Sequence, residues 1–251
     1  MQKITALLIY LMLTVTAFGQ KHKDKPGDET STIQSTQVVP QDSIYMRMYR
    51  NSLKFGDART AIQAVYGMMA LHPDSAKYVD SLAILYYVSG SYGQALATGK
   101  QAYTRNPSSM KFLEIIASSE QKLGMAKEAI DHYDKLFKTT QKLFYAYQEA
   151  VLEYSIQRYG ECMGNLDFLI QSKEAATEKI QIPNSNTTLQ EVPLKAAALN
   201  LEGIVYEEQK DNVKAKENFK KALDISPDFV LAKSNLENLD KDKTEKAEKA
   251  K

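Results

Sequence analysis

The 251-residue sequence has few of the side chains that build disulfides and metal sites. It contains one cysteine, three histidines and no tryptophan. A single cysteine excludes an intramolecular disulfide, and so small a set of histidine and cysteine leaves little for a zinc site. The formal net charge is +1, whereas nucleic-acid-binding proteins usually carry a clear basic excess. We therefore expect neither a metal centre nor a nucleic-acid partner.

The motifs of common catalytic sites are also missing. The sequence has no glycine-rich phosphate loop, no nucleophile elbow and no His-Glu-x-x-His. His132 follows Glu128 by four residues, which is typical of a surface ion pair. A general base is the alternative for His132, but the sequence places no second catalytic group beside it. The sequence therefore predicts a non-enzymatic protein with no cofactor and no catalytic residues.

The first 19 residues have the pattern of a secretory signal peptide. Lys3 precedes an apolar run from Ile4 to Thr16, and the small residues Ala17 and Gly19 stand just before Gln20, the expected first residue after cleavage. An uncleaved anchor is the alternative, although a membrane-spanning helix needs about 20 apolar residues. No cysteine lies near the cleavage point, so a lipid anchor is not expected. The pattern predicts an exported protein.

Two polar segments flank the predicted folded domain, which spans residues 42–240. Residues 20–41 carry Pro26, Gly27 and Pro40 and show no apolar period, so they are predicted to form a flexible spacer. Residues 241–251 alternate lysine with acidic and small residues. They are predicted to form a charged, flexible tail.

A 34-residue period organises the domain. It separates three sets of positions: Gly56, Gly90 and Gly124; Ala61, Ala95 and Ala129; and Pro73 and Pro107. Within each repeat, apolar residues recur at helical spacing, as at Val79, Leu82, Ala83 and Tyr86. A turn with glycine follows, then a second helical stripe that ends before proline. Each repeat is therefore predicted to be a helix–turn–helix hairpin.

This repeat resembles the tetratricopeptide repeat (TPR) family. The last repeat matches the family's signature at six positions: Gly203, Tyr206, Ala215, Phe219, Ala222 and Pro227. It departs from the signature at Leu199, where tryptophan is usual, and at Glu202, where leucine is usual. The resemblance implies an all-α fold, a right-handed α-solenoid of about five hairpins with a C-terminal capping helix. No hairpin buries its apolar face alone, so stacking neighbours form one core.

The register divides the domain into five repeats and one insertion. The repeats are predicted at 42–75, 76–109, 110–143, 144–171 and 196–229, the insertion at 172–195 and the capping helix at 229–240. Within the insertion, residues 180–183 alternate like a short strand and residues 184–188 are rich in turn formers. The insertion is either functional or a tolerated surface loop. Cys162 takes a small-residue position, which predicts core packing.

In TPR proteins the first helices of the hairpins line a concave ligand groove. The resemblance places nine candidate partner-binding residues there: Arg50, Lys54, Asp80, Tyr87, Glu114, Gln121, Gln148, Asn200 and Glu207. Of the five positions that hold acidic chaperone tails in some members, only Arg50 is basic, so that ligand is not expected. The mixed apolar and polar groove suits an extended peptide or a helix.

The combined features resemble those of bacterial envelope TPR proteins. They imply an exported protein–protein interaction scaffold, either periplasmic in a Gram-negative envelope or secreted. The alternative is a glycan- or peptidoglycan-associated module, in which exposed tyrosines such as Tyr87 stack on sugar rings. The sequence identifies neither the partner nor the oligomeric state.

Overall fold

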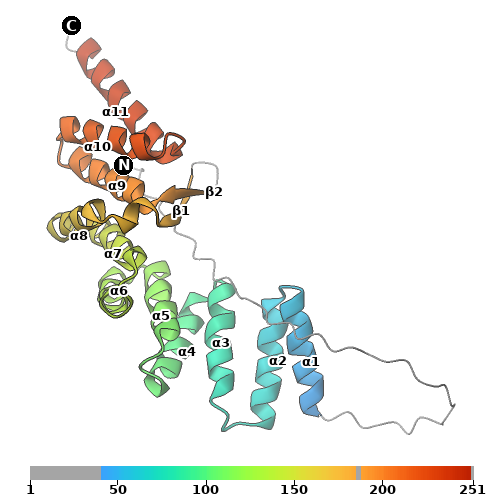
Figure 1. The fold of residues 1–251 in the computed structure, drawn as a ribbon. Coiled ribbons are helices and arrows are strands. Elements are labelled where there is room, and N and C mark those ends of the chain that lie inside the picture. The colour runs from blue at the N-terminus through green and yellow to red at the C-terminus, as the bar shows by residue number, and fades with distance from the viewer. Residues whose placement is uncertain (1–40, 185–187, 250–251) are drawn as a thin grey trace, which may run out of the picture. The chain divides into compact units, whose positions relative to one another are not determined.

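The computed structural model describes residues 41–184 and 188–249, so the predicted signal peptide and nearly all of the predicted spacer lie outside the described residues. Helices in consecutive antiparallel pairs dominate this part of the chain (Figure 1). The elements are α1 (Gln41–Lys54), α2 (Ala58–Leu71), α3 (Lys77–Val88), α4 (Tyr92–Arg105), α5 (Met110–Lys122), α6 (Ala126–Thr140), α7 (Leu143–Ser155), α8 (Tyr159–Gln171), the 3-10 helix η1 (Glu174–Ala176), β1 (Lys179–Pro183), β2 (Leu189–Pro193), α9 (Leu194–Glu208), α10 (Asn212–Ile225) and α11 (Val230–Lys249).

The described chain forms two compact units, an N-terminal unit that ends at Tyr78 and a C-terminal unit that begins at Val79. In the N-terminal unit, α1 and α2 pack as a hairpin. Asp57 caps α2, because its Oδ1 accepts a hydrogen bond from the Thr60 amide at 3.0 Å. The two helices approach closely where the Tyr45 ring lies against Gly67, which has no Cβ to obstruct it.

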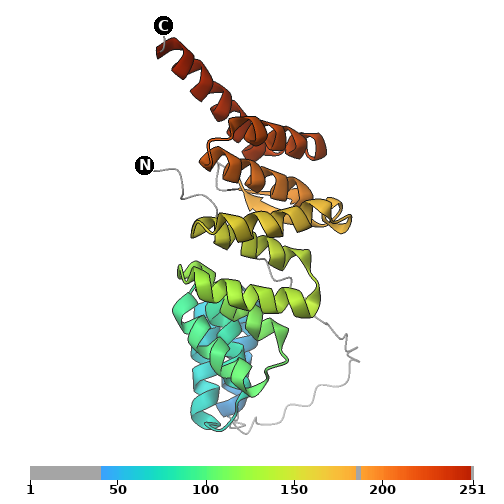
Figure 2. The same cartoon turned by 90° about the vertical axis from the view of Figure 1, so that its left-hand side faces the viewer.

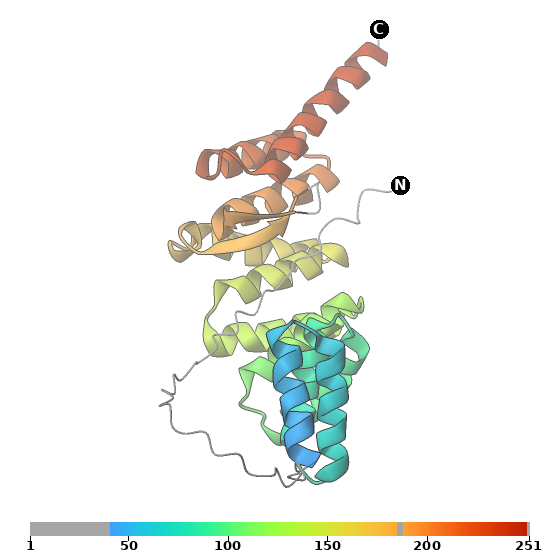
Figure 3. The same ribbon diagram turned by 90° about the vertical axis from the view of Figure 1, so that its right-hand side faces the viewer.

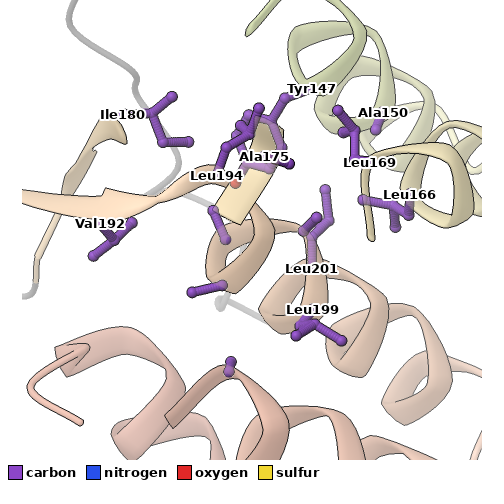
Figure 4. Packing of buried hydrophobic residues seen from close by; sticks show 14 of the residues in the cluster. Tyr147, Ala150, Leu166, Leu169, Ala175, Ile180, Val192, Leu194, Leu199 and Leu201 are labelled. Carbon is purple, nitrogen blue, oxygen red and sulfur yellow. The ribbon is translucent and has the colours of Figure 1, made fainter. Parts of the chain in front are cut away.

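In the C-terminal unit the hairpins from α5 to α10 follow one another, each helix packing on the next (Figure 2). The predicted all-α fold of consecutive TPR-type hairpins with a C-terminal helix is confirmed. One hydrophobic cluster spans the α7–α8 hairpin and α9, as Figure 4 shows for Tyr147, Leu166, Leu169, Leu199 and Leu201. Cys162 is fully buried in this core, as predicted, and burial raises the pKa of its thiol to about 12.

The periodic glycines occupy one conformation, in the turn between the two helices of a hairpin. Gly56, Gly90 and Gly124 have φ of +69°, +75° and +76°, a region that residues with a Cβ enter at a cost. The equivalent positions in the fourth and fifth repeats are Gln157 and Lys210, at φ of +62° and +64°. The turns of the fourth and fifth repeats therefore keep the left-handed conformation although they lack the glycine.

This difference predicts that Lys210→Gly raises the free energy of unfolding by about 0.5 kcal/mol, since glycine relieves the left-handed strain but adds some unfolded-state entropy. Lys220→Gly, in the interior of α10, is the matched control and should lower it by about 1 kcal/mol. Chemical denaturation followed by circular dichroism measures both. A loss of stability for Lys210→Gly would contradict the strain argument.

The insertion is an ordered β-hairpin. β1 and β2 form an antiparallel pair (Figure 3). Ile180 lies opposite Val192, and both residues are buried in the cluster of α7, α8 and α9. The side chain of Gln190 joins this hairpin to the turn before α11: Nε2 donates to the Asp228 carbonyl at 2.7 Å, and Oε1 accepts from the Val230 amide at 3.0 Å. The insertion therefore belongs to the packed structure of the C-terminal unit.

Three predicted boundaries differ from the structure. The capping helix does not end at residue 240: α11 continues to Lys249, so the flexible tail predicted at 241–251 is wrong for residues 241–249. Lysine, glutamate and alanine all have high helix propensity, so a helix already anchored by its packed first turns can extend through them. At the other end, α1 begins at Gln41, the last residue of the predicted spacer, and α9 begins at Leu194, within the predicted insertion.

Candidate functional site

The nine predicted partner-binding residues lie in both compact units. Arg50 and Lys54 are exposed on α1 of the N-terminal unit. The other seven lie in the C-terminal unit, on the first helices α3, α5, α7 and α9: Asp80, Tyr87, Glu114, Gln121, Gln148, Asn200 and Glu207. Among these seven, Gln121 on α5 contacts Gln148 on α7.

A hydrogen-bonded chain joins α5, α6 and α7. The Tyr133 hydroxyl lies 3.1 Å from Ser118 Oγ and donates to Gln121 Oε1 at 2.8 Å. Gln121 Nε2 in turn donates to Gln148 Oε1 at 3.0 Å. Tyr133 and Ser118 are buried. We call Ser118, Gln121, Tyr133 and Gln148 the polar chain.

Gln148 has one amide hydrogen-bonding group unused. Its side chain is only 1 % exposed, and among the described residues Nε2 has no hydrogen-bond partner. A buried donor without a partner costs about 1–3 kcal/mol. Because Nε2 is enclosed by the surrounding helices, an acceptor from outside the protein can reach it only if the Gln148 side chain turns outward.

Glu114 adds a carboxylate next to the polar chain. It hydrogen-bonds with Tyr145 on α7, whose ring stacks on that of Tyr133 with centroids 6.0 Å apart. Burial raises the pKa of Glu114, and the nearby Lys142 and the Tyr145 hydrogen bond offset this only in part. Burial and the adjacent Glu114 also raise the pKa of the Tyr145 hydroxyl. The site therefore holds protonated hydroxyls and a half-buried carboxyl.

Further along the row, Asn200 on α9 accepts a hydrogen bond from Asn235 Nδ2 on α11 at 3.0 Å. Amide pairs thus bridge α5 to α7 and α9 to α11, and we call Gln121, Gln148, Asn200 and Asn235 the amide row. Asp80 is paired with Arg105 on α4, and Glu207 is half-buried. Asn235 is not among the predicted partner-binding residues, because the repeat register gives the last helix the role of a cap.

Tyr87 does not form an exposed platform for sugars. It is buried in the cluster that α3, α4 and α5 share, and its ring lies edge-on to Tyr92 with centroids 6.0 Å apart. The sequence-based expectation of an exposed Tyr87 is therefore wrong. The physical reason is that α3 packs against both α4 and α5, so its apolar face is wider than the register alone indicates.

A buried charged group that the sequence analysis missed lies between α4, α5 and α6. Glu120 is fully buried; its Oε2 accepts from His132 Nδ1 at 2.6 Å, and its Oε1 forms an ion pair with Lys100 Nζ at 3.0 Å. Although burial alone would raise it, the pKa of Glu120 is lowered by these two partners. His132 thus pairs with Glu120 rather than with Glu128. The repeat register contained a signal for Glu120. It stands 34 residues after Tyr86 and 34 before Tyr154, so an acidic residue takes a position that is aromatic in the two neighbouring repeats.

A hollow of about 600 Å³ opens between α8, α9 and α10. Glu202, the departure from the TPR signature, lines it together with Tyr206 and Lys221. Burial and the neighbouring acid Asp167 raise the pKa of Glu202. In the wall of the hollow, Lys221 pairs with Glu217 at 2.7 Å.

Two properties of the described residues bear on chemistry. Nowhere in residues 41–184 and 188–249 do three histidine, cysteine or acidic side chains gather as metal ligands. No described helix is long and apolar enough to cross a membrane. The site as described offers hydrogen-bond donors and acceptors from neighbouring helices.

No protein-family model matches the chain, and no curated protein matches it in sequence. Solved structures do resemble it. A crystal structure of MamA is 18 % identical with a TM-score of 0.58, and the match covers 74 % of this chain and 92 % of that one. MamA from Desulfovibrio magneticus RS-1 is 10 % identical with a TM-score of 0.59, covering 76 % and 98 %. YrrB, described as a TPR protein with an unusual peptide-binding site, is 16 % identical with a TM-score of 0.57, covering 75 % and 88 %. At these identities the likeness shows the TPR-type fold alone.

Proposed function

We propose that this chain is an exported, non-enzymatic scaffold that binds an extended peptide segment of a partner protein along the first helices of its C-terminal unit. The TPR-type fold supports this proposal because successive hairpins present equivalent helix faces side by side. The similar YrrB is described as having a peptide-binding site. The predicted signal peptide supports export, to the periplasm or beyond.

The observation that carries the proposal is the amide row and its unused donor. A peptide backbone offers one carbonyl acceptor and, except at proline, one N–H donor per residue. Side-chain amides can satisfy both, because each has a carbonyl oxygen and two N–H donors. Gln148 Nε2 is buried and has no partner among the described residues; after the Gln148 side chain turns outward, it would donate to a backbone carbonyl of the bound segment. Glu114 would select against an acidic side chain beside it.

A peptide selection tests the proposal. The full chain would be screened against a displayed library of random peptides, and the affinity of the selected peptides measured by calorimetry. Gln148→Leu is expected to weaken binding at least tenfold, because it removes the donor and leaves the peptide acceptor unpaired. Glu114→Lys should shift the selected sequences toward acidic residues.

The matched controls lie on second helices of the same unit. Gln94→Leu on α4 and Glu128→Lys on α6 change the same residue types at exposed positions, and should leave peptide affinity unchanged. Selection of no peptide, or of peptides whose affinity falls equally for the controls, would reject the proposed binding face.

A further inference from the structure

The side of α1 that faces away from α2 carries both basic and apolar side chains. Between Ser43 and Gly56 the only charged residues are Arg47, Arg50 and Lys54, and all three are exposed. Their spacing of three and four residues aligns them along one side of the helix. This side is opposite the one that packs on α2, where Ser52 is buried and Tyr45 meets Gly67.

Exposed apolar side chains flank this basic stripe. Ile44 and Leu53 are each 48 % exposed, and Phe55, in the turn after α1, is 77 % exposed. The Lys54 ammonium lies 5.7 Å from the centroid of the Phe55 ring. From Ile44 to Phe55 the surface runs for about 16 Å of helix axis. We call Ile44, Arg47, Arg50, Leu53, Lys54 and Phe55 the α1 surface.

We propose that the α1 surface docks on an anionic phospholipid bilayer. Its cations match the charge of lipid phosphates, and its protruding apolar side chains can enter the boundary between headgroups and acyl chains. At the C-terminal end of α1, the Lys54 ammonium stands between Leu53 and Phe55, the two side chains that would enter the bilayer. The inference is independent of the peptide-binding proposal, because it concerns the N-terminal unit alone.

Charge complementarity selects this occupant over two others. In a two-fold dimer through the same surface, the row of cations in one copy would face the row of cations in the other, and like charges repel. Lysine is usually depleted at protein–protein interfaces, although arginine is enriched there, and here Lys54 lies at the tip of the surface beside Phe55. An anionic bilayer accommodates both the row of cations and the exposed apolar side chains beside it.

The absence of tryptophan from the chain allows a specific test in the full-length protein. Phe55→Trp places a single reporter in the α1 surface. Val213→Trp places one on α10, at a position that is 74 % exposed and so matches Phe55 before binding. Each protein would be mixed with vesicles of phosphatidylcholine alone, and with vesicles that also contain phosphatidylglycerol.

With the anionic vesicles, the tryptophan emission of the Phe55→Trp protein is expected to shift to the blue and to be quenched by lipids brominated on their acyl chains. The emission of the Val213→Trp protein should not change. Arg47→Glu with Lys54→Glu, added to Phe55→Trp, should weaken the vesicle affinity at least tenfold, whereas Lys127→Glu with Lys220→Glu should not. The full-length chain also contains the N-terminal apolar run, which could bind vesicles by itself. Binding through that run alone would leave the emission of the Phe55→Trp protein unshifted, so the reporter distinguishes it from docking through the α1 surface.

Four results would overturn the proposal: no shift for Phe55→Trp, equal shifts for Phe55→Trp and Val213→Trp, the same response to both vesicle types, or a shift without lipid that grows with protein concentration. The last of these would indicate self-association. An acidic protein partner would give the first, since vesicles would then have no effect on the reporter.

Discussion

Replacing Gly203 with alanine is expected to lower the free energy of unfolding by about 3 kcal/mol, among the largest effects of a single added methyl group. A Cβ at this position would lie 2.5 Å from Cε1 of Phe219. Phe219 is fully buried and packs with Ala215 and Leu239. The ring therefore has no free space into which it could move, and α9 and α10 would have to separate.

Urea denaturation followed by circular dichroism measures this loss. Gly164→Ala on α8 is the matched control, because nothing lies within 4 Å of the position that its added methyl group would take; it should raise stability by about 0.5–1 kcal/mol through helix propensity. Adding Phe219→Leu to Gly203→Ala should recover part of the loss, since it removes the clashing ring edge. A Gly203→Ala protein as stable as the parent would contradict the close approach of α9 to α10.

The second large effect is expected at Glu149 on α7. Its side chain is buried, and Oε1 has no hydrogen-bond partner among the described residues. Burial, with Asp134 and Glu153 nearby, raises its pKa from 4.5 to about 8, and Lys138 and Asn165 offset this only in part. The folded protein therefore holds a proton on Glu149 under conditions in which the unfolded chain has released it.

This retention makes stability fall as the pH rises. Below a pH near 4.5 the carboxyl is protonated in the folded and unfolded states, so it does not change the free energy of unfolding. Between pH 4.5 and about 8 the unfolded chain releases the proton and the folded protein keeps it, so the free energy of unfolding falls as the pH rises. Above about 8 the loss of stability is complete. Glu149→Gln mimics the protonated form. We expect it to match the parent at low pH and to exceed it by about 5 kcal/mol at high pH.

Denaturation midpoints of both proteins, measured from about pH 5 to about pH 9, give the difference directly. Taking the difference removes the contribution of every other titrating group. Glu128→Gln, an exposed position on α6, controls for the change of net charge and should show no pH-dependent gain. A constant difference between Glu149→Gln and the parent over this range would show that Glu149 is ionised in the folded protein.

The repeat architecture could be predicted because its determinants are local and periodic. Gly56, Gly90 and Gly124 mark turns that all need the same left-handed backbone, and their spacing is visible without a structure. Gln157 and Lys210 adopt that conformation without the glycine, and so gave no such signal. The helix bounds of most repeats fall within one or two residues of the register.

The site was less accessible to sequence reasoning, since the register places a side chain on a face but does not decide what covers it. Tyr87 was expected to be exposed and is buried, whereas Gln148 was expected to face a ligand and is also held by Gln121. The partner of His132 proved to be Glu120, on another helix. Pairings of this kind depend on the distance between helices, which one sequence does not specify.

The sequence by itself determined the class of fold, the number of hairpins and the places where each turns, because periodic apolar residues and glycines act through neighbours three to four positions away. Because the chain has a single cysteine, core packing was the role that the sequence predicted for Cys162. Only the tertiary structure decided which polar groups stay unsatisfied, how the β-hairpin of the insertion joins the core, and which charges are buried. Those outcomes depend on side chains brought together from distant repeats, where desolvation and packing geometry, rather than local propensity, set the free energy.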